Sequence, residues 1–206
     1  NTSGHGFQLS STSGAISLTN DASVAAGGDG VNISTTTGNV GLINNYGIAS
    51  TLNGANITSS GGNITFSNAV NANVGSTGGS AVKATTSGAG TVNLVNLGWL
   101  GNNGVSSYGM YGATQDGTLT LQNSGTIASA ENASAGVFGS STTGAITASN
   151  QAGSLINTSG HGFQLSSTTG AISLTNDASI AAGGDGVNIS TTTGNVGLIN
   201  NYGIAS

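Results

Sequence analysis

The sequence lacks several residue types on which common folds and binding sites depend. It contains no cysteine and no proline, and Lys and Arg together number one. Without cysteine the chain can form neither disulfide bonds nor thiolate metal sites. With one basic side chain and a formal net charge of −5, it also lacks the positive surface that a phosphate backbone requires. We therefore expect no nucleic-acid partner.

Charge and long apolar runs are scarce as well. Charged residues make up 3% of the chain, against about 25% in average soluble proteins. No apolar run approaches the roughly 20 residues that a helix needs to cross a bilayer, so we expect no direct membrane insertion of this segment. Disordered chains are usually rich in proline or charge, and this chain is rich in neither.

The apolar residues that are present alternate with polar ones. They make up 35% of the chain and recur in short stretches such as FQL, AISL, NVGL, NITF and TLTL. A period of two residues is typical of β-strands. The 37 glycines argue against long helices. The sequence therefore predicts an all-β fold.

A long repeat organises the chain. Residues 1–50 and 157–206 differ only at Ser13 against Thr169 and at Val24 against Ile180. Residues 1–156 thus form one full repeat, and residues 157–206 begin a near-identical second one. We expect residues 1–206 to form a single continuous structure.

A shorter repeat lies inside the long one. Six units of 24 to 28 residues each place a glycine before an apolar pair, with asparagine two residues after the pair. Each unit contains three short strands, which are too few to bury a hydrophobic face, so the units must stack. Stacked units with parallel strands form a β-solenoid, and parallel connections are generally right-handed. The sequence therefore predicts a right-handed parallel β-helix with six coils in each 156-residue repeat.

The asparagines are expected to form a structural ladder inside this β-helix. Their offset from the apolar pair places them in phase with the inward-facing residues, where amides one coil apart can bond to each other. An inward asparagine without such a partner would be a buried unsatisfied amide. The predicted ladder consists of Asn20, Asn44, Asn68, Asn96, Asn123, Asn150, Asn176 and Asn200.

Two further expectations concern the turns. The recurring glycine of stretches such as STSG, TTTG and STTG is expected to supply a left-handed or a tight backbone. The distance from the ladder asparagine to the next coil varies from 11 to 14 residues. We expect almost all of this variation to lie at one corner of the solenoid.

Large apolar residues at outward positions form a candidate binding patch. In VNLVNLGWL, alternation places every second residue outward, and aromatic residues of the next coils stack above Lys83. A contiguous exposed apolar patch usually marks an interface; the alternative is that the long corners fold over these side chains and bury them. The candidate residues are Val95, Leu97, Trp99, Tyr108, Tyr111 and Phe138.

The polar residues do not predict a catalytic or metal site. His5 and Asp29 occupy equivalent positions one coil apart, as do His161 and Asp185, but no nucleophile is singled out beside them. The stretch AAGGDGVNIS resembles a calcium-binding nonapeptide but has Asn32 where aspartate is expected. We expect no enzymatic activity, no catalytic residues, no metal and no cofactor.

The style of the repeats resembles a known group of surface proteins. The stretches QNSGTIASAENASAGVFG and INNYGIAS, in a chain rich in Gly, Asn, Ser and Thr, are similar to passenger repeats of bacterial autotransporters and large two-partner-secreted adhesins. This resemblance implies a right-handed β-helix displayed outside the cell, at a bacterial surface.

Two functional hypotheses follow. In the first, the chain is a structural repeat segment of a long cell-surface fibre or adhesin, whose partners are further copies of itself, end to end or side by side. In the second, it is a carbohydrate- or protein-binding module that recognises a surface glycan or protein through the aromatic patch.

Overall fold

The computed structural model describes residues 3–102, 107–129 and 133–206. These residues form 24 strands and no helix. The strands make three parallel sheets of eight strands each. The chain is therefore an all-β solenoid with three strands per coil and about 26 residues per coil, which confirms the predicted fold class.

Each sheet takes every third strand of the chain. Sheet A contains β1 (Phe7–Ser11), β4 (Val31–Thr35), β7 (Ala55–Ser59), β10 (Val82–Thr86), β13 (Tyr108–Thr114), β16 (Ala135–Ser141), β19 (His161–Ser167) and β22 (Val187–Thr191). Sheet B contains β2 (Ile16–Asn20), β5 (Val40–Asn44), β8 (Ile64–Asn68), β11 (Val92–Asn96), β14 (Leu119–Asn123), β17 (Ile146–Asn150), β20 (Ile172–Asn176) and β23 (Val196–Asn200). Sheet C contains β3 (Val24–Ala26), β6 (Gly47–Ser50), β9 (Asn73–Ser76), β12 (Trp99–Asn102), β15 (Thr126–Ser129), β18 (Leu155–Thr158), β21 (Ser179–Ala182) and β24 (Ile204–Ala205).

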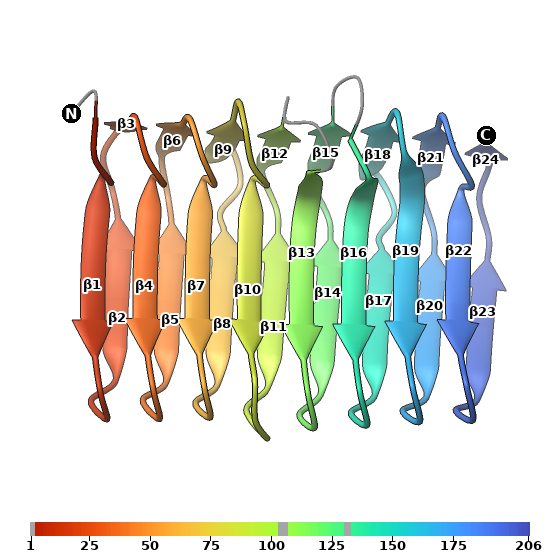
Figure 1. Cartoon of the computed structure of the whole chain (residues 1–206). Coiled ribbons are helices and arrows are strands. Elements are labelled where there is room, and N and C mark those ends of the chain that lie inside the picture. The colour runs from red at the N-terminus through yellow and green to blue at the C-terminus, as the bar shows by residue number, and fades with distance from the viewer. Residues whose placement is uncertain (1–2, 103–106, 130–132) are drawn as a thin grey trace.

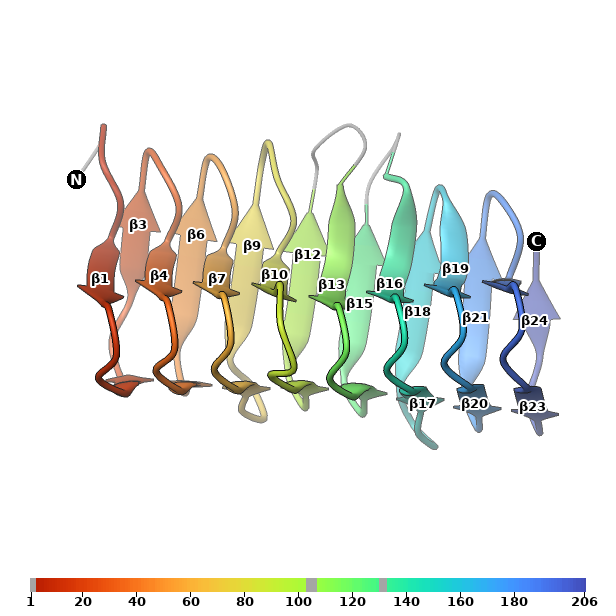
Figure 2. The same ribbon diagram turned by 60° about the horizontal axis from the view of Figure 1, so that its bottom comes forward.

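The path of the chain is right-handed. In Figure 1 the chain advances from left to right while the near strands of sheet A run downward and the far strands of sheet B run upward. Figure 2 shows sheet C closing the third side of the stack. The two termini lie at opposite ends of the resulting rod.

The core is a set of inward columns, in the register that the repeats predict. Phe7 pairs with Val31, Ile16 with Val40, and Val24 with Ile48. In the interior coils these positions are occupied by Val, Ile, Leu, Phe, Met or Ala with almost no exposure. Side chains at alternate positions point outward, as expected for strands.

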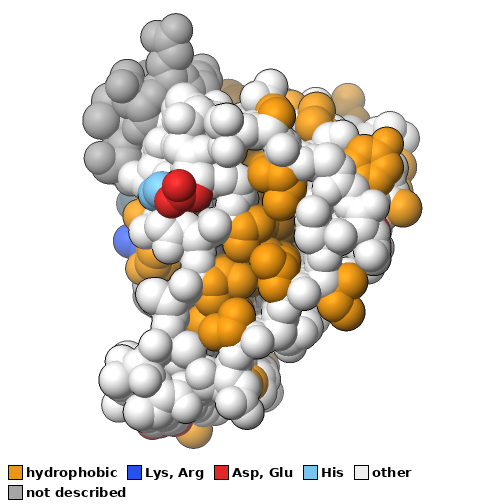
Figure 3. Space-filling view, turned by 90° about the vertical axis from the view of Figure 1, so that its right-hand side faces the viewer, with side chains coloured by type: hydrophobic (Ala, Val, Ile, Leu, Met, Phe, Trp, Pro, Cys, Tyr) orange, Lys and Arg blue, Asp and Glu red, His pale blue; other side chains and the backbone are white. Residues whose placement is uncertain are grey.

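The second, partial repeat shows how much of this core depends on stacking. Leu42 is 1% exposed, whereas Leu198, at the equivalent position of the last coil, is 48% exposed. Likewise Val40 is 2% exposed and Val196 is 50% exposed. Figure 3 looks at this end of the rod, where hydrophobic side chains form a band across the coil. A single coil therefore does not bury its own apolar side chains; the next coil does.

The insertions lie mainly at two corners, and β10–β11 between sheets A and B is one residue longer than β7–β8. The expectation that almost all of the variation lies at one corner was therefore wrong. The connections β8–β9 and β17–β18 each contain four residues, whereas β5–β6 and β11–β12 contain two. Asn71 (φ 65°) and Gly153 (φ 84°) lie in the two longer connections and are the described residues with positive φ. The corner between sheets C and A also varies, because β9–β10 is one residue longer than β6–β7.

The turn glycines are required for close packing and not for a left-handed backbone. A Cβ on Gly38, Gly62 or Gly117 would overlap the carbonyl oxygen of the equivalent glycine in the preceding coil. None of these glycines has a positive φ. Of the two roles expected for the turn glycine, a left-handed backbone or a tight one, the structure shows the tight one. The backbones of successive A–B turns pack directly against each other.

Candidate functional site

The predicted ladder asparagines lie in one column at the end of the sheet B strands. Each amide nitrogen donates to the amide oxygen of the next asparagine, over distances of 2.8 to 2.9 Å from Asn20 through to Asn200. Asn20 through Asn176 are buried, and Asn200, in the last coil, is exposed.

Second bonds anchor the ladder to the B–C turns. The amide nitrogen of Asn44 also donates to the Tyr46 carbonyl oxygen at 2.7 Å, and that of Asn96 donates to the Gly98 carbonyl oxygen at 3.2 Å. Both amide hydrogens of these side chains are thus used. The ladder therefore ties each coil to the next coil and to its own turn.

A second polar column escaped the sequence analysis. At the end of several sheet A strands, a Ser or Thr hydroxyl accepts a hydrogen bond from the turn glycine three residues later. Examples are Thr35 with Gly38 at 3.0 Å and Ser59 with Gly62 at 2.8 Å. The signal was the recurring pattern [ST]-x-x-G, a side-chain-capped turn, but the abundance of Ser and Thr concealed it.

The six candidate patch residues do not share one surface. Val95 lies half-buried on β11 of sheet B, and Leu97 lies exposed at the corner between sheets B and C. Trp99 begins β12 on sheet C and is 39% exposed. Tyr108, Tyr111 and Phe138 lie half-buried on β13 and β16 of sheet A. They are therefore on a different side of the rod.

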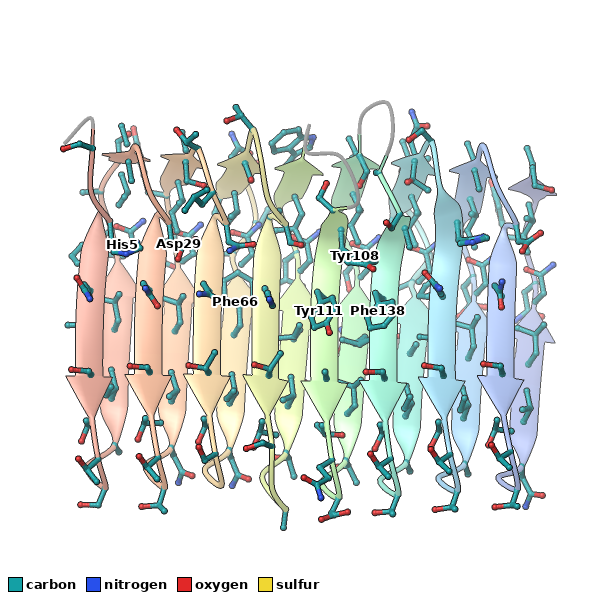
Figure 4. All side chains as sticks on the ribbon, in the orientation of Figure 1. His5, Asp29, Phe66, Tyr108, Tyr111 and Phe138 are labelled. Carbon is teal, nitrogen blue, oxygen red and sulfur yellow. The ribbon has the colours of Figure 1, made fainter. Side chains whose placement is uncertain are left out.

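The three aromatic residues of sheet A form a compact cluster (Figure 4). Tyr111 and Phe138 stack with ring centroids 4.7 Å apart and an interplanar angle of 11°. Tyr108 packs against both rings in tilted geometry. The Lys83 ammonium lies 5.7 Å from the centroid of the Tyr111 ring. The ring of Tyr111 is thus contacted by Phe138 in the following coil and by Lys83 in the preceding one.

A hollow lies beside this cluster, at the corner between sheets C and A. Its volume is about 220 Å³. Burial raises the pKa of the Tyr111 hydroxyl above its usual value, and the charge of Tyr108 adds to this effect. The lining residues are Asn53, Gly78, Gly79, Ser80, Lys83, Ser107, Tyr108 and Tyr111.

Trp99 belongs to a different surface. Its indole ring covers Gly101, because a Cβ on Gly101 would overlap the ring, and it reaches toward Gly75 in the preceding coil. Trp99 and Leu97 line one hollow together with Val70, which is 65% exposed. Leu155, 37% exposed, lies two strands further along the Trp99 column. We call Val70, Leu97, Trp99 and Leu155 the sheet C apolar cluster.

The His5 and Asp29 pair is a corner contact. The Asp29 backbone N–H donates to His5 Nδ1 at 3.1 Å, and Asp29 Oδ2 lies 3.6 Å from the same nitrogen. The Asp29 carboxylate accepts further bonds from Asn53 and Asn56. In a catalytic triad the carboxylate instead accepts a hydrogen from Nδ1 of the histidine. Because His5 Nδ1 accepts the amide hydrogen of Asp29, the geometry differs from that of a triad.

Within residues 3–102, 107–129 and 133–206, no group of three or more His, Cys, Asp or Glu side chains is placed to hold a metal ion. The same residues contain no helix whose length and apolar character would let it cross a bilayer.

The structure of the solenoid is the basis for the functional proposal, because comparisons with known proteins gave no match. No protein-family model, no curated protein and no solved structure matches the chain.

Proposed function

We propose that the chain is a structural repeat segment of a long fibre or adhesin on a bacterial cell surface. The observation that carries this proposal is the continuity of the stack across the boundary between the two repeats. Strand β16 of the first repeat pairs with β19 of the second in parallel register, and the Asn150 amide donates to Asn176 at 2.9 Å. A tandem array of the 156-residue repeat would therefore be one uninterrupted rod.

The surface location rests on the resemblance to autotransporter and two-partner-secreted passenger repeats. A chain without cysteine or proline, whose coils share the same arrangement of three strands, suits a rod that folds outside the cell without disulfide bonds. Antibody labelling of intact cells that produce the full-length protein tests this location. Labelling that requires permeabilised cells would contradict it.

The rod function is tested by counting repeats. We would produce arrays of one, two and three 156-residue repeats and measure their lengths by electron microscopy. Six coils at about 4.8 Å each predict an increase of about 29 Å for each added repeat at constant width. Particles that grow in width, or that form separate beads joined by linkers, would overturn the proposal.

Lateral association between rods is part of the proposal. The sheet C apolar cluster supports it, because exposed Trp and Leu side chains gathered around a hollow are typical of contact surfaces. The cluster would recur once in each repeat of an array, so weak contacts would add along a rigid rod.

The second candidate function, a binding module, is favoured by the hollow beside Lys83. Stacking of a sugar ring on Tyr111 receives little support, because Phe138 and Lys83 already contact that ring. Recognition at this site would instead depend on the charge of Lys83 and on polar groups.

A further inference from the structure

Lys83 is the one basic Lys or Arg side chain of an acidic chain, and the structure places it at the edge of a hollow. Within the described residues its ammonium contacts the Tyr111 ring and forms no ion pair with a carboxylate. A lysine elsewhere on this surface could lie beside any of several aspartates. At this position its charge remains available to a ligand.

Two tyrosines line the same hollow. Tyr108 and Tyr111 contact each other through their rings, and in the described part of the chain neither hydroxyl has a hydrogen-bond partner. Because burial raises the pKa of Tyr111, its hydroxyl stays protonated at neutral pH and can donate a hydrogen bond. The hollow therefore combines one positive charge with hydrogen-bond donors.

The carboxylate of Asp29, which bonds to the lining residue Asn53, does not itself line the hollow. Asp29 is 4% exposed and is not among the lining residues. Its oxygens accept bonds from the Asn53 backbone N–H at 2.8 Å, from the Asn53 amide at 3.0 Å and from the Asn56 amide at 3.3 Å. These donors hold the carboxylate one coil below the hollow.

We propose that the hollow binds one carboxylate-bearing sugar unit of an acidic polysaccharide. A single lysine acts as a point charge that can pair with one carboxylate, and the chain lacks the arginine forks that bind phosphate or carboxylate in a bidentate manner. A volume of about 220 Å³ is below the usual range of drug-sized pockets, so it suits a small group such as one sugar ring. Apart from Tyr108 and Tyr111, the lining residues are polar or glycine, which favours a polyhydroxylated ligand over an apolar peptide side chain.

This binding function goes beyond the rod function and does not depend on it. One exposed ion pair contributes only about 0–1 kcal/mol, so a single hollow binds weakly. In an array each 156-residue repeat would carry one hollow, and a polysaccharide that contacts several of them would bind much more tightly.

The test is an NMR titration of the 206-residue chain with a trisaccharide of galacturonic acid, compared with the neutral trisaccharide maltotriose. We expect the backbone amide signals of Gly79 and Ser80 to shift with the acidic sugar and not with the neutral one. Lys83→Met keeps most of the length of the side chain and removes its charge. It should weaken binding about fivefold, a loss of about 1 kcal/mol, while the length of a Lys83→Met array stays unchanged.

A matched control moves the charge without changing the net charge. Gln164 occupies the Lys83 column on β19, next to Phe138 in register, and does not line the hollow. The double variant Lys83→Gln, Gln164→Lys should bind as weakly as Lys83→Met. The proposal would be overturned if the acidic sugar caused no shift, or if the neutral trisaccharide bound as tightly as the acidic one. It would also be overturned if the double variant bound the acidic sugar as tightly as the original chain does, or if an acidic peptide bound as tightly as the acidic sugar.

Discussion

At the scale of single residues, the ladder asparagines join adjacent coils through side chains as well as through the backbone. Asn96 accepts from Asn68 and donates to Asn123, both at 2.9 Å, and is fully buried. A buried amide in this position is favourable only while both neighbours are present, because each orphaned polar group costs about 1–3 kcal/mol.

Replacement of Asn96 by alanine tests this dependence. It leaves the Asn123 oxygen without its ladder donor and the Asn68 nitrogen without its ladder acceptor, so we expect a loss of about 2–4 kcal/mol in the free energy of unfolding. Urea denaturation followed by circular dichroism measures the change.

Asn200→Ala is the matched control for Asn96→Ala. Asn200 is the exposed last member of the ladder, where water can replace the lost partner, so the change should cost less than about 1 kcal/mol. Equal losses at the two positions would show that burial in the ladder contributes nothing.

The sequence predicted this column better than it predicted the candidate binding residues. The asparagine offset is constant in every coil, and a constant offset from inward residues fixes both direction and partner. The outward direction of Trp99 and Tyr111 follows equally from alternation. Whether they share a surface depends on which sheet each strand joins, and alternation within a strand does not determine this.

At the scale of strands and turns, the A–B turn is the most constrained element of the coil. Its glycines stack carbonyl against Cα from coil to coil, and the neighbouring hydroxyl column fixes the turn amides. The sequence showed that glycine was needed at the turn but left two reasons open. A positive φ and a close approach of backbones both select glycine, so the residue type alone does not separate them.

Gly117→Ala tests by experiment how much the close approach of the stacked turns costs a larger residue. Its Cβ would overlap the Gly90 carbonyl oxygen, and backbone atoms of a stacked coil cannot move as a flexible side chain would. We expect a destabilisation of about 2 kcal/mol or more, measured by urea denaturation.

Gly41→Ala serves as the comparison for Gly117→Ala. Gly41 lies on β5 with nothing within 4 Å of an added Cβ, so this change should remain within about 0.5 kcal/mol of the original stability. A tolerated Gly117→Ala substitution would contradict the account of the turn.

At the scale of the whole molecule, the rod is stabilised by interfaces between similarly folded coils. Folding would therefore need a sequence pattern that recurs only once per coil. The six coils of the 156-residue repeat nevertheless differ on their outer faces. The hollow beside Lys83 and the sheet C apolar cluster each occur where coils depart from the simple pattern, and they lie on different sides of the rod. Core packing does not explain this longer period, which suggests that contacts outside the rod do.

Lateral association should therefore depend on one side of the rod and not on the other. Trp99 is 39% exposed at the centre of the sheet C apolar cluster, whereas Tyr111 lies half-buried between Lys83 and Phe138. In arrays of several repeats, Trp99→Ser should abolish side-by-side bundling seen by electron microscopy. Tyr111→Ser, an equivalent aromatic replacement on sheet A, should leave bundling intact.

The reason for this difference is that every repeat of a rod carries the same contact, so the contribution of a single contact to bundling is repeated along the whole rod. A Trp side chain covers a large area with few rotatable bonds, and rods aligned through one such contact in each repeat bring all further contacts into register at high effective concentration. Loss of a weak contact at every repeat should therefore eliminate bundles and not merely reduce them. If Trp99→Ser arrays bundle as the original arrays do, or if only Tyr111→Ser arrays lose bundling, the sheet C apolar cluster is not the lateral contact.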